Sequence, residues 1–388
     1  MDMERGISGQ YEVSTVSGER VSAFVPHRLP PNPPLVINQS RQLLLERATL
    51  AVGRLDSIST LLPDPDLFLY TYVRREAVLS SQIEGTQSSL SDLLLYELEE
   101  VPGVPFDDVI EVSNYVAALD HGMARLREGF PLSNRLIREV HSKLLSRGRG
   151  SEKLPGEFRR SQNWIGGTRP GNAHFVPPPP ARVEDCMASL ERFIHDMDGP
   201  YPVLLKAALA HVQFETIHPF LDGNGRVGRL LIALILHQSG VLSQPLLYLS
   251  LYFKQHRSEY YRLLDVVRMS GEWEAWLDFF LEGVEQTASG AVRITQRLTA
   301  IFHEDADRIK DLGRSSTATL RIFDALCQRP IVTINEICRR TGVSFPTATK
   351  GMLALINLGI VREQTSQRRN RVFLYNRYLS ILNGEPEL

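Results

Sequence analysis

Apolar residues recur at intervals of three and four along most of the chain, which is the spacing of one face of an α-helix. Residues 10–26 instead alternate around Ser17-Gly18, which predicts a β-hairpin, and a proline-rich connector follows from Pro26 to Pro34. The chain is therefore expected to be mainly α-helical. Helices are predicted near residues 38–61, 66–84, 87–98, 107–126, 133–147, 182–197, 202–215, 225–239, 256–269 and 272–308.

The stretch from Val203 to Glu215 is almost wholly apolar, and we expect it to form a central buried helix. His211 and Glu215 lie four residues apart in it, so both fall on one face. Because no third ligand is evident in the sequence, we predict buried hydrogen-bonding roles for this pair rather than metal binding.

The chain of 388 residues, 43% of them hydrophobic, is long enough for two or three domains with their own cores. Its net charge of −2 produces no global attraction to nucleic acid or membrane. The cysteines Cys186, Cys327 and Cys338 are far apart, which indicates neither a disulfide framework nor a zinc site. No signal peptide or membrane-spanning apolar run is evident, so we expect a soluble cytoplasmic protein.

The run His218-Pro-Phe-Leu-Asp-Gly-Asn-Gly-Arg-Val-Gly-Arg229 has a composition suited to binding a phosphate chain. Its glycines open an apolar helix, where bare backbone N–H groups and the helix dipole attract an anion. Arg226 and Arg229 add forked charge-assisted contacts, and Asp222 suits a magnesium ion that takes its other ligands from water and phosphate. His218 has the side chain best suited to accept a proton near neutral pH.

A simpler interpretation of this run is a loop, a turn and a basic helix start, with His218 buried in the core. Packing alone does not explain an Asp-Gly-Asn-Gly turn flanked by arginines, however. The twelve residues resemble the signature of the Fic family, His-Pro-Phe-x-Asp/Glu-Gly-Asn-Gly-Arg-x-x-Arg, and match it at every fixed position. The resemblance covers roughly residues 38–310.

Fic proteins are mostly protein adenylyltransferases. The resemblance therefore implies transfer of AMP from ATP to a Ser, Thr or Tyr hydroxyl of a target protein, or of the chain itself, with release of pyrophosphate. It implies that His218 is the general base and that Asp222 holds Mg²⁺. The phosphates would be bound by Gly223, Asn224, Gly225, Arg226, Val227, Gly228 and Arg229.

Within that segment, the resemblance implies that residues 223–225 surround the α-phosphate and that Arg226 and Arg229 hold the β- and γ-phosphates. The intact Gly-Asn-Gly pattern favours AMP over other phosphate-containing groups. Tyr260 and Tyr261 lie in the segment where the family places aromatic contacts to adenine, and Tyr260 is the predicted contact. A helical tyrosine is otherwise more often packed in a core.

A second motif ends the helix predicted over residues 66–84. Gly85 suits the left-handed conformation that closes many helices, and Glu84 would lie in the last turn, one turn after Ser80. A carboxylate there is unfavourable unless a cation lies nearby, and a solvated glutamate is the simpler interpretation from spacing alone.

Ser80-x-x-x-Glu84-Gly85 nevertheless resembles the inhibitory motif of Fic proteins. The resemblance implies that Glu84 pairs with Arg229 and keeps ATP from a productive γ-phosphate position. In some relatives the same glutamate supports removal of AMP, so de-adenylylation is a second hypothesis.

Residues 157–180 contain two short apolar pieces, Trp164-Ile165 and His174-Phe175-Val176, on either side of a Gly, Pro and Asn cluster. This pattern predicts a hairpin with a long loop. It is either a surface hairpin that covers the core or, as the resemblance implies, a flap that aligns an extended target segment by strand addition.

From about Ser316 the pattern changes to three short helices, near 317–327, 333–341 and 346–358, and two strands, near 360–363 and 371–375. This order is typical of a winged helix-turn-helix. Residues 314–388 contain 11 basic and 5 acidic residues, and Arg368, Arg369 and Arg371 lie at the expected wing tip. Such a patch suits DNA phosphates, although winged helices also serve as protein-interaction or dimerisation modules.

Three regions are therefore predicted: an N-terminal region with hairpin, connector and inhibitory helix (1–104), a Fic-type helical core with a small β-hairpin flap (105–310), and a winged helix-turn-helix domain (314–388). Two functions remain open. One is an autoinhibited adenylyltransferase, and the other is a DNA-binding regulator whose Fic core senses nucleotide without transferring it. Because the family includes dimers, a homodimer is a further hypothesis.

Overall fold

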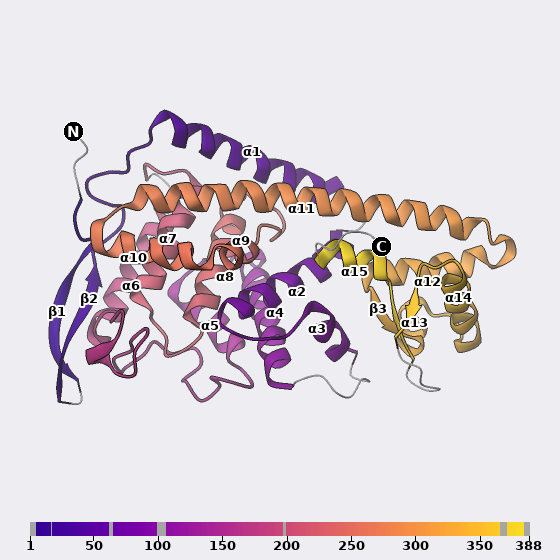
Figure 1. Cartoon of the computed structure of the whole chain (residues 1–388), viewed down its shortest axis with the longest axis horizontal. Coiled ribbons are helices and arrows are strands. Elements are labelled where there is room, and N and C mark those ends of the chain that lie inside the picture. Colours follow the sequence, from indigo (N-terminus) through magenta and orange to yellow (C-terminus); the bar gives the residue numbers. More distant parts are fainter. Residues whose placement is uncertain are drawn as a thin grey trace.

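The computed structural model describes residues 5–16, 18–61, 65–98, 106–196, 199–364 and 371–383. Its body is a group of helices with a β-hairpin at one end and a smaller helical unit at the other, and the longest helix, α11 (Trp273–Lys310), runs along both (Figure 1). The predicted mainly helical fold is confirmed. Among the described residues, no helix combines the length and the apolar content needed to cross a bilayer.

The N-terminal strands form the predicted hairpin. Strand β1 (Gly9–Val16) pairs antiparallel with β2 (Glu19–Pro26), with Gly9 opposite Pro26. After the proline-rich connector, α1 (Gln39–Leu61) packs lengthwise on α11, and the two helices lie side by side in Figure 1.

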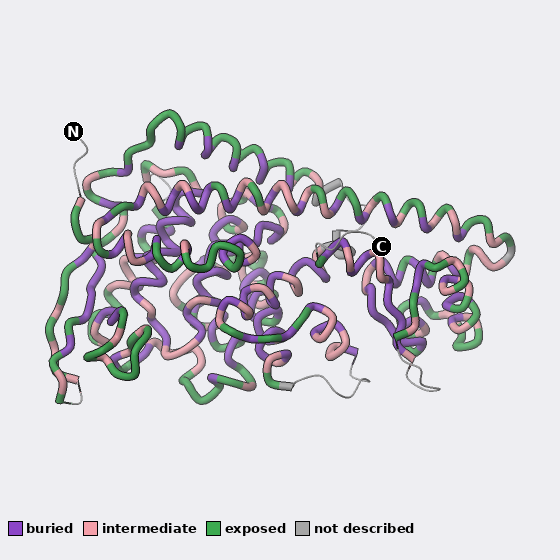
Figure 2. Tube along the Cα trace, viewed as in Figure 1, coloured by how far each residue is buried: buried purple, intermediate pink, exposed green. Residues whose placement is uncertain are grey.

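Helix α7 (Val203–Ile217) is the centre of the body, as its apolar sequence predicted. Every residue from Leu204 to Ile217 is buried, and Figure 2 shows buried segments concentrated in this part of the molecule. The helices packed against α7 are α6 (Pro180–His195), α8 (Asn224–Gln238), α10 (Arg257–Ser270) and α11.

A second group of helices lies beside α8. Helix α2 (Pro65–Ile83) contacts α3 (Leu90–Tyr96), α4 (Phe106–Arg127), α8 and the short helix α9 (Ser250–Gln255), and α4 packs against α5 (Asn134–Leu144). The sequence did not predict α9. The predicted boundary between residues 104 and 105 falls in the segment 99–105, which lies outside the described residues. The helices before and after this segment share one hydrophobic core.

The C-terminal part contains helices and a small sheet. Antiparallel pairing gives the strand order β3-β5-β4, and β3 was not predicted, nor was the last helix, α15. Arg368 and Arg369, predicted at a wing tip, lie outside the described residues. The elements are η2 (Gly313–Ser315), α12 (Ser316–Gln328), β3 (Ile331–Thr333), α13 (Ile334–Thr341), α14 (Phe345–Asn357), β4 (Arg362–Glu363), β5 (Val372–Leu374) and α15 (Asn376–Asn383).

Candidate functional site

The loop between α7 and α8 begins at His218, which ends α7 in a left-handed conformation with φ +49°. Its N–H donates to the carbonyl of Phe214 at 2.9 Å, and its own carbonyl accepts a hydrogen bond from Nε of Arg159 at 2.9 Å. Residues other than glycine rarely adopt this conformation, and where they do, a functional constraint is common. The backbone of His218 is therefore held in a defined position.

The imidazole of His218 is half-buried at the base of this loop. Burial lowers its pKa to about 3, and the nearby charges of Arg159 and Arg268 act in the same direction. Its Nδ1 atom is buried without a hydrogen-bond partner in the described part of the chain. The side chain is therefore neutral near pH 7 and able to accept a proton.

Two residues that the sequence did not single out hold the loop in place. Arg159 donates to the carbonyls of His218 and Pro178 and is almost completely buried. His141 accepts from the Gly156 N–H at 2.8 Å, so its Nε2 donates to the Asp222 carbonyl at 3.0 Å. Each makes its contact with a segment far away in the sequence, which leaves no local pattern from which to predict it.

The start of α8 has the form expected of an anion site. Gly223 precedes the helix with φ +76°, and the side chain of Asn224 both donates to and accepts from the backbone of Phe220 at 2.8 Å. Residues 224–226 are the first three of the helix, so their N–H groups have no carbonyl partner within it. These donors lie at the positive end of the helix dipole.

Two residues of the predicted phosphate-binding segment face the core instead. Val227 is buried among apolar side chains, and the carbonyl of Gly228 accepts a hydrogen bond from Nδ1 of His211 at 2.9 Å. Successive residues of an α-helix point about 100° apart, so only part of a continuous helical segment can face a bound ligand. His211 has the buried hydrogen-bonding role that the sequence predicted.

The predicted adenine contact of Tyr260 does not fit its surroundings. The residue is 1% exposed, its ring stacks on Phe253 with centroids 4.6 Å apart, and its hydroxyl donates to Nε2 of His211 at 2.8 Å. Tyr261, 40% exposed, is the tyrosine of this pair that reaches the surface. The rotation of α10 about its axis decides which of two adjacent tyrosines is buried, and that rotation is set by packing.

Arg226 is paired with a carboxylate from outside the signature. Its Nη1 donates to Oε2 of Glu111 on α4 at 3.2 Å, and both side chains are almost completely buried. Burial raises the pKa of Glu111, and the charges of Arg226 and Arg149 only partly oppose this. The sequence did not predict this pair.

The carboxylate of Asp222 lies beside these groups. Its Oδ1 accepts from the Gly223 N–H at 2.6 Å and lies 3.6 Å from Nη2 of Arg226. Its Oδ2 lies beside Gly150, where a Cβ would come within 3.0 Å. This glycine leaves space next to the carboxylate, which fits a magnesium ion held by one carboxylate together with water and phosphate oxygens.

The predicted inhibitory motif lies directly on α8. Helix α2 ends at Ile83, so Glu84 is the first residue after the helix rather than part of its last turn, and Gly85 has φ +103°. Nη2 of Arg229 donates to Oε1 of Glu84 at 2.8 Å, and Nε of Arg229 donates to Oγ of Ser80 at 2.8 Å. Arg229 is therefore the cation that stabilises the Glu84 carboxylate at the C-terminal end of α2.

Burial acts on both members of this pair, and their mutual attraction opposes it. Burial alone would raise the pKa of Glu84, but the charge and hydrogen bond of Arg229 lower it below its ordinary value. Burial alone would lower the pKa of Arg229, but Glu84 raises it above its ordinary value. Both groups are thus charged near neutral pH.

The predicted hairpin at residues 157–180 is present as one antiparallel bridge. The Ile165 N–H donates to the Phe175 carbonyl at 2.8 Å, and a short 3₁₀ turn, η1 (Pro170–Asn172), lies between them. The Val176 carbonyl accepts from the Phe24 N–H of β2 at 2.8 Å. This attachment to the N-terminal hairpin was not predicted.

Comparison with known proteins identifies the two motif-bearing regions. Residues 42–124 match the family described as Fic/DOC family N-terminal, and residues 131–236 match the Fic/DOC family. The first match contains Glu84, and the second contains the run from His218 to Arg229. The chain therefore contains a Fic/DOC family N-terminal region and a Fic/DOC domain.

Individual relatives agree with this assignment. Proteins named Protein adenylyltransferase Fic from Drosophila ananassae and Drosophila virilis are each 31% identical to the chain, over 209 and 211 residues. The first alignment covers 53% of this chain and 39% of that protein, and the second covers 53% and 40%. The chain thus spans about two fifths of the length of the curated relatives it matches.

Solved structures show the same fold. A Fic family protein from Desulfovibrio desulfuricans superposes with a TM-score of 0.55 at 20% identity, covering 89% of this chain and 98% of that one. A Fic domain containing signaling protein from Bacteroides thetaiotaomicron gives a TM-score of 0.53 at 20% identity, covering 65% of this chain and 97% of that one.

Proposed function

We propose that the chain is a protein adenylyltransferase that transfers AMP from ATP to a Ser, Thr or Tyr hydroxyl of a target protein or of itself. The observation that supports this most directly is the loop from residue 218 to residue 224. It joins a neutral imidazole at one end to the free N–H groups of a helix start at the other. Acid–base and anion-binding groups are thus held within one short loop.

In the proposed reaction, the hydroxyl oxygen attacks the α-phosphorus of ATP and a new P–O bond forms. The bond from the α-phosphorus to the oxygen of pyrophosphate breaks, and pyrophosphate leaves with the electron pair. The proton of the hydroxyl passes to the imidazole of His218, which is unprotonated because burial lowers its pKa. The N–H groups of residues 224–226 stabilise the charge that develops on the phosphate oxygens.

Magnesium, held by Asp222, would neutralise part of the triphosphate charge. The other charged groups in reach are Arg226 and Arg229, and each is paired with a carboxylate, Glu111 or Glu84. ATP phosphates would therefore have to compete with these carboxylates for the arginines. The Glu84 pair is only partly buried, since the Glu84 side chain is 31% exposed.

We further propose that Glu84 holds the enzyme in a state of low activity. Its carboxylate is hydrogen-bonded to Arg229 and packs against Gly225 at the start of α8. A negatively charged side chain there opposes the binding of a triphosphate in the same place. The contacts of the Glu84 carboxylate with Arg229 and Gly225 support this role more strongly than the spacing of the motif in the sequence does.

The reaction type can be tested with ATP labelled at either end of the triphosphate, in a Glu84→Gly background. We expect label from the α-phosphate on protein, none from the γ-phosphate, and loss of the α-label when His218→Ala is added. Protein labelled from the γ-phosphate, or α-label that persists without His218, would overturn the proposed reaction.

De-adenylylation remains a second proposed activity of the same site. The partly exposed carboxylate of Glu84 is suited to orienting a water molecule toward bound AMP. AMP-labelled protein incubated with wild type should lose its label faster than with Glu84→Gln. Equal rates of loss would remove this activity from the proposal.

For residues 314–388 we propose a winged helix-turn-helix domain. The order helix, strand, helix, helix, strand, strand and the antiparallel pairing of its strands support this assignment. Thr333 and Ser344 cap α13 and α14 by accepting from the N–H groups of Glu336 and Thr347.

The alternative function, a DNA-binding regulator, has weaker support. Arg339 and Arg340 pair with Glu336, and Arg371 pairs with Glu363, so these cations are less available to phosphates. The face of α14 exposes Phe345 and Leu353, which suits contact with a protein. A salt-sensitive complex with DNA, formed without any protein labelling from ATP, would support the regulator instead.

A further inference from the structure

The N-terminal hairpin has one strand edge that is attached to the body and one that is open. In Figure 1, β1 lies at one end of the molecule and β2 separates it from the helices. The inner edge, that of β2, is attached to the segment 157–180, because the Phe24 N–H donates to the Val176 carbonyl at 2.8 Å. The outer edge is that of β1, and Figure 2 shows this strand more exposed than β2.

The register of the hairpin shows which backbone groups of β1 point outward. In an antiparallel pair, residues that exchange hydrogen bonds alternate with residues whose N–H and C=O groups point away from the partner strand. Phe24 donates away from β1, so Tyr11, which lies opposite it, also points away. Val13 and Thr15 follow at the same spacing. The N–H and C=O groups of these three residues point to the open edge, where no other described segment pairs with them.

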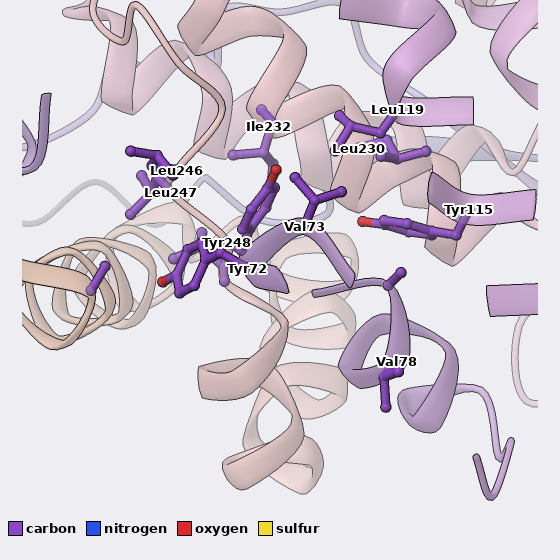
Figure 3. Packing of buried hydrophobic residues seen from close by; sticks show 14 of the residues in the cluster. Tyr72, Val73, Val78, Tyr115, Leu119, Leu230, Ile232, Leu246, Leu247 and Tyr248 are labelled. Atoms are coloured by element: carbon purple, nitrogen blue, oxygen red, sulfur yellow. The ribbon is translucent and has the colours of Figure 1, made fainter. Parts of the chain in front are cut away.

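Apolar side chains are exposed along this edge. Tyr11 is 47% exposed and Val13 is 54% exposed, and the Tyr11 hydroxyl lies against Sδ of the exposed Met269. In the helical body, large apolar side chains instead pack on one another, as the close view of the core shows (Figure 3). A strand edge with exposed apolar side chains is a template for another strand.

The features that usually prevent such pairing are not found in β1. Soluble proteins protect their strand edges with proline, lysine or a bulge. From Gly9 to Val16 the strand contains no proline or lysine, and its pairing with β2 is continuous over these eight described residues. Its charged residue, Glu12, points to the other face of the hairpin and pairs there with Arg182 at 2.7 Å. The edge is therefore suited to a partner strand.

We propose that β1 pairs antiparallel with β1 of a second copy of this chain, with Val13 on the twofold axis. Each Val13 then lies opposite the partner's Val13, and Tyr11 lies opposite the partner's Thr15. All three outward-facing residues of each strand exchange hydrogen bonds with the other strand. The side chains that face each other are aromatic or β-branched, which is the combination that stabilises strand pairs.

The sequence of β1 is self-complementary in this register, which favours a second copy as the partner. Reversal about Val13 places Glu12 opposite the partner's Ser14. Reversal about Glu12 would instead place two carboxylates directly opposite each other, and like charges in that position destabilise a strand pair. The assembly closes at two chains, because the other edge of each β1 is already paired with β2.

The pairing joins the sheets of the two chains into one. In each chain the hydrogen bonds continue from β1 through β2 to Val176, at the end of the predicted hairpin of residues 157–180. Arg169 of that segment also pairs with Glu19 of β2. The segments 157–180 of the two chains therefore lie at opposite ends of one continuous sheet.

Association can be measured by analytical ultracentrifugation of the full chain from about 1 to about 500 µM, because a single strand pair is a small and weak interface. We expect a monomer–dimer equilibrium. Val13→Lys places two like charges on the twofold axis and should abolish the dimer. Ser22→Lys is the matched control, because Ser22 is exposed and lies directly opposite Val13 on β2, away from the open edge. This variant should still form the dimer.

Cross-linking tests the register. Val13→Cys places two thiols opposite each other and should give a disulfide-linked dimer under mild oxidation with copper phenanthroline. Tyr11→Cys should not cross-link with itself, but it should cross-link with Thr15→Cys when the two variants are mixed. Wild type is the control for the native cysteines, which are Cys186, Cys327 and Cys338.

A monomer at every concentration would overturn the proposed pairing, and so would a dimer that persists in Val13→Lys. Cross-linking of Tyr11→Cys with itself, without cross-linking of Val13→Cys, would overturn the register. None of these measurements uses ATP, so their outcome is independent of the proposed AMP transfer.

Discussion

A carboxylate oxygen of Glu84 occupies the space that a side chain on Gly225 would need. Gly225 is the second residue of α8, so this carboxylate lies over the helix start whose N–H groups are suited to phosphate. The same carboxylate is hydrogen-bonded to Arg229 at 2.8 Å. The Glu84 side chain thus covers the two groups that the signature offers to a triphosphate, namely the N–H groups at the start of α8 and the guanidinium of Arg229.

Ser80 contributes to holding Arg229, and its removal should be costly. Ser80→Ala leaves Nε of the buried Arg229 without the acceptor it has at 2.8 Å. We expect a loss of about 1–3 kcal/mol in the free energy of unfolding, measured by urea denaturation. The weaker hold on Arg229 should also raise AMP transfer.

Ser81 is the matched control for this prediction. It is equally buried, but its hydroxyl has no hydrogen-bond partner in the described part of the chain. Ser81→Ala should therefore be neutral or slightly stabilising. Equal losses for the two variants would show that the contact with Arg229 contributes nothing specific.

Asp222→Asn should reduce transfer and change its dependence on magnesium. The amide keeps an oxygen that can accept from the Gly223 N–H, as Oδ1 does at 2.6 Å, but it removes the negative charge. We expect transfer on the order of 100-fold slower at fixed magnesium, with part of the loss recovered at higher concentration. A variant with the wild-type rate and magnesium dependence would remove Asp222 from the metal site.

Glu215 should make the folded state less stable as the pH rises. Burial raises the pKa of this carboxyl from 4.5 to about 7, with Arg229 and Arg268 acting in the opposite direction and Glu84 in the same one. Between pH 4.5 and 7 the folded state therefore keeps a proton that the unfolded state releases. The contribution of Glu215 to the free energy of unfolding is therefore fully present below pH 4.5 and is lost as the pH rises through 7.

Glu215→Gln removes this ionisation and should reveal the effect directly. The variant should gain stability over wild type from near zero at pH 4.5 to about 3 kcal/mol above pH 7. Urea denaturation at pH 5 and pH 8 measures the difference in the free energy of unfolding between the variant and wild type. Glu46→Gln on the exposed side of α1 is the control. A difference between Glu215→Gln and wild type that does not change with pH would contradict the burial of a protonated Glu215 carboxyl.

Much of the helical fold could be predicted because its patterns are long and local. The apolar stretch that forms α7 is buried along almost its whole length, and Gly223 lies immediately before α8, at the helix start that the signature suggested. The pairing of Glu84 with Arg229 was also predicted, but from resemblance to a family rather than from spacing.

The unpredicted features depend on contacts between distant segments. Glu111 and Arg226 are 115 positions apart, and Arg159 and His218 are 59 apart, so neither pair produces a periodic signal. The choice between Tyr260 and Tyr261 depends on the rotation of α10 against its neighbours. Short elements such as α9, with six residues, offer too few positions for a period to be seen.

The central claim is that Glu84 restrains transfer, and one comparison of rates tests it most directly. The matched control is Glu128→Gly, because Glu128 also follows the end of a helix, α4, and precedes a glycine, Gly129, with φ +82°. Within the described residues, the ion pair that Glu128 makes is with Arg125 on the surface.

The measurement is the initial rate of AMP transfer from α-labelled ATP by wild type, Glu84→Gly and Glu128→Gly. We predict a rate about 10- to 100-fold above wild type for Glu84→Gly and no change for Glu128→Gly. A Glu84→Gly rate equal to that of wild type would contradict the account.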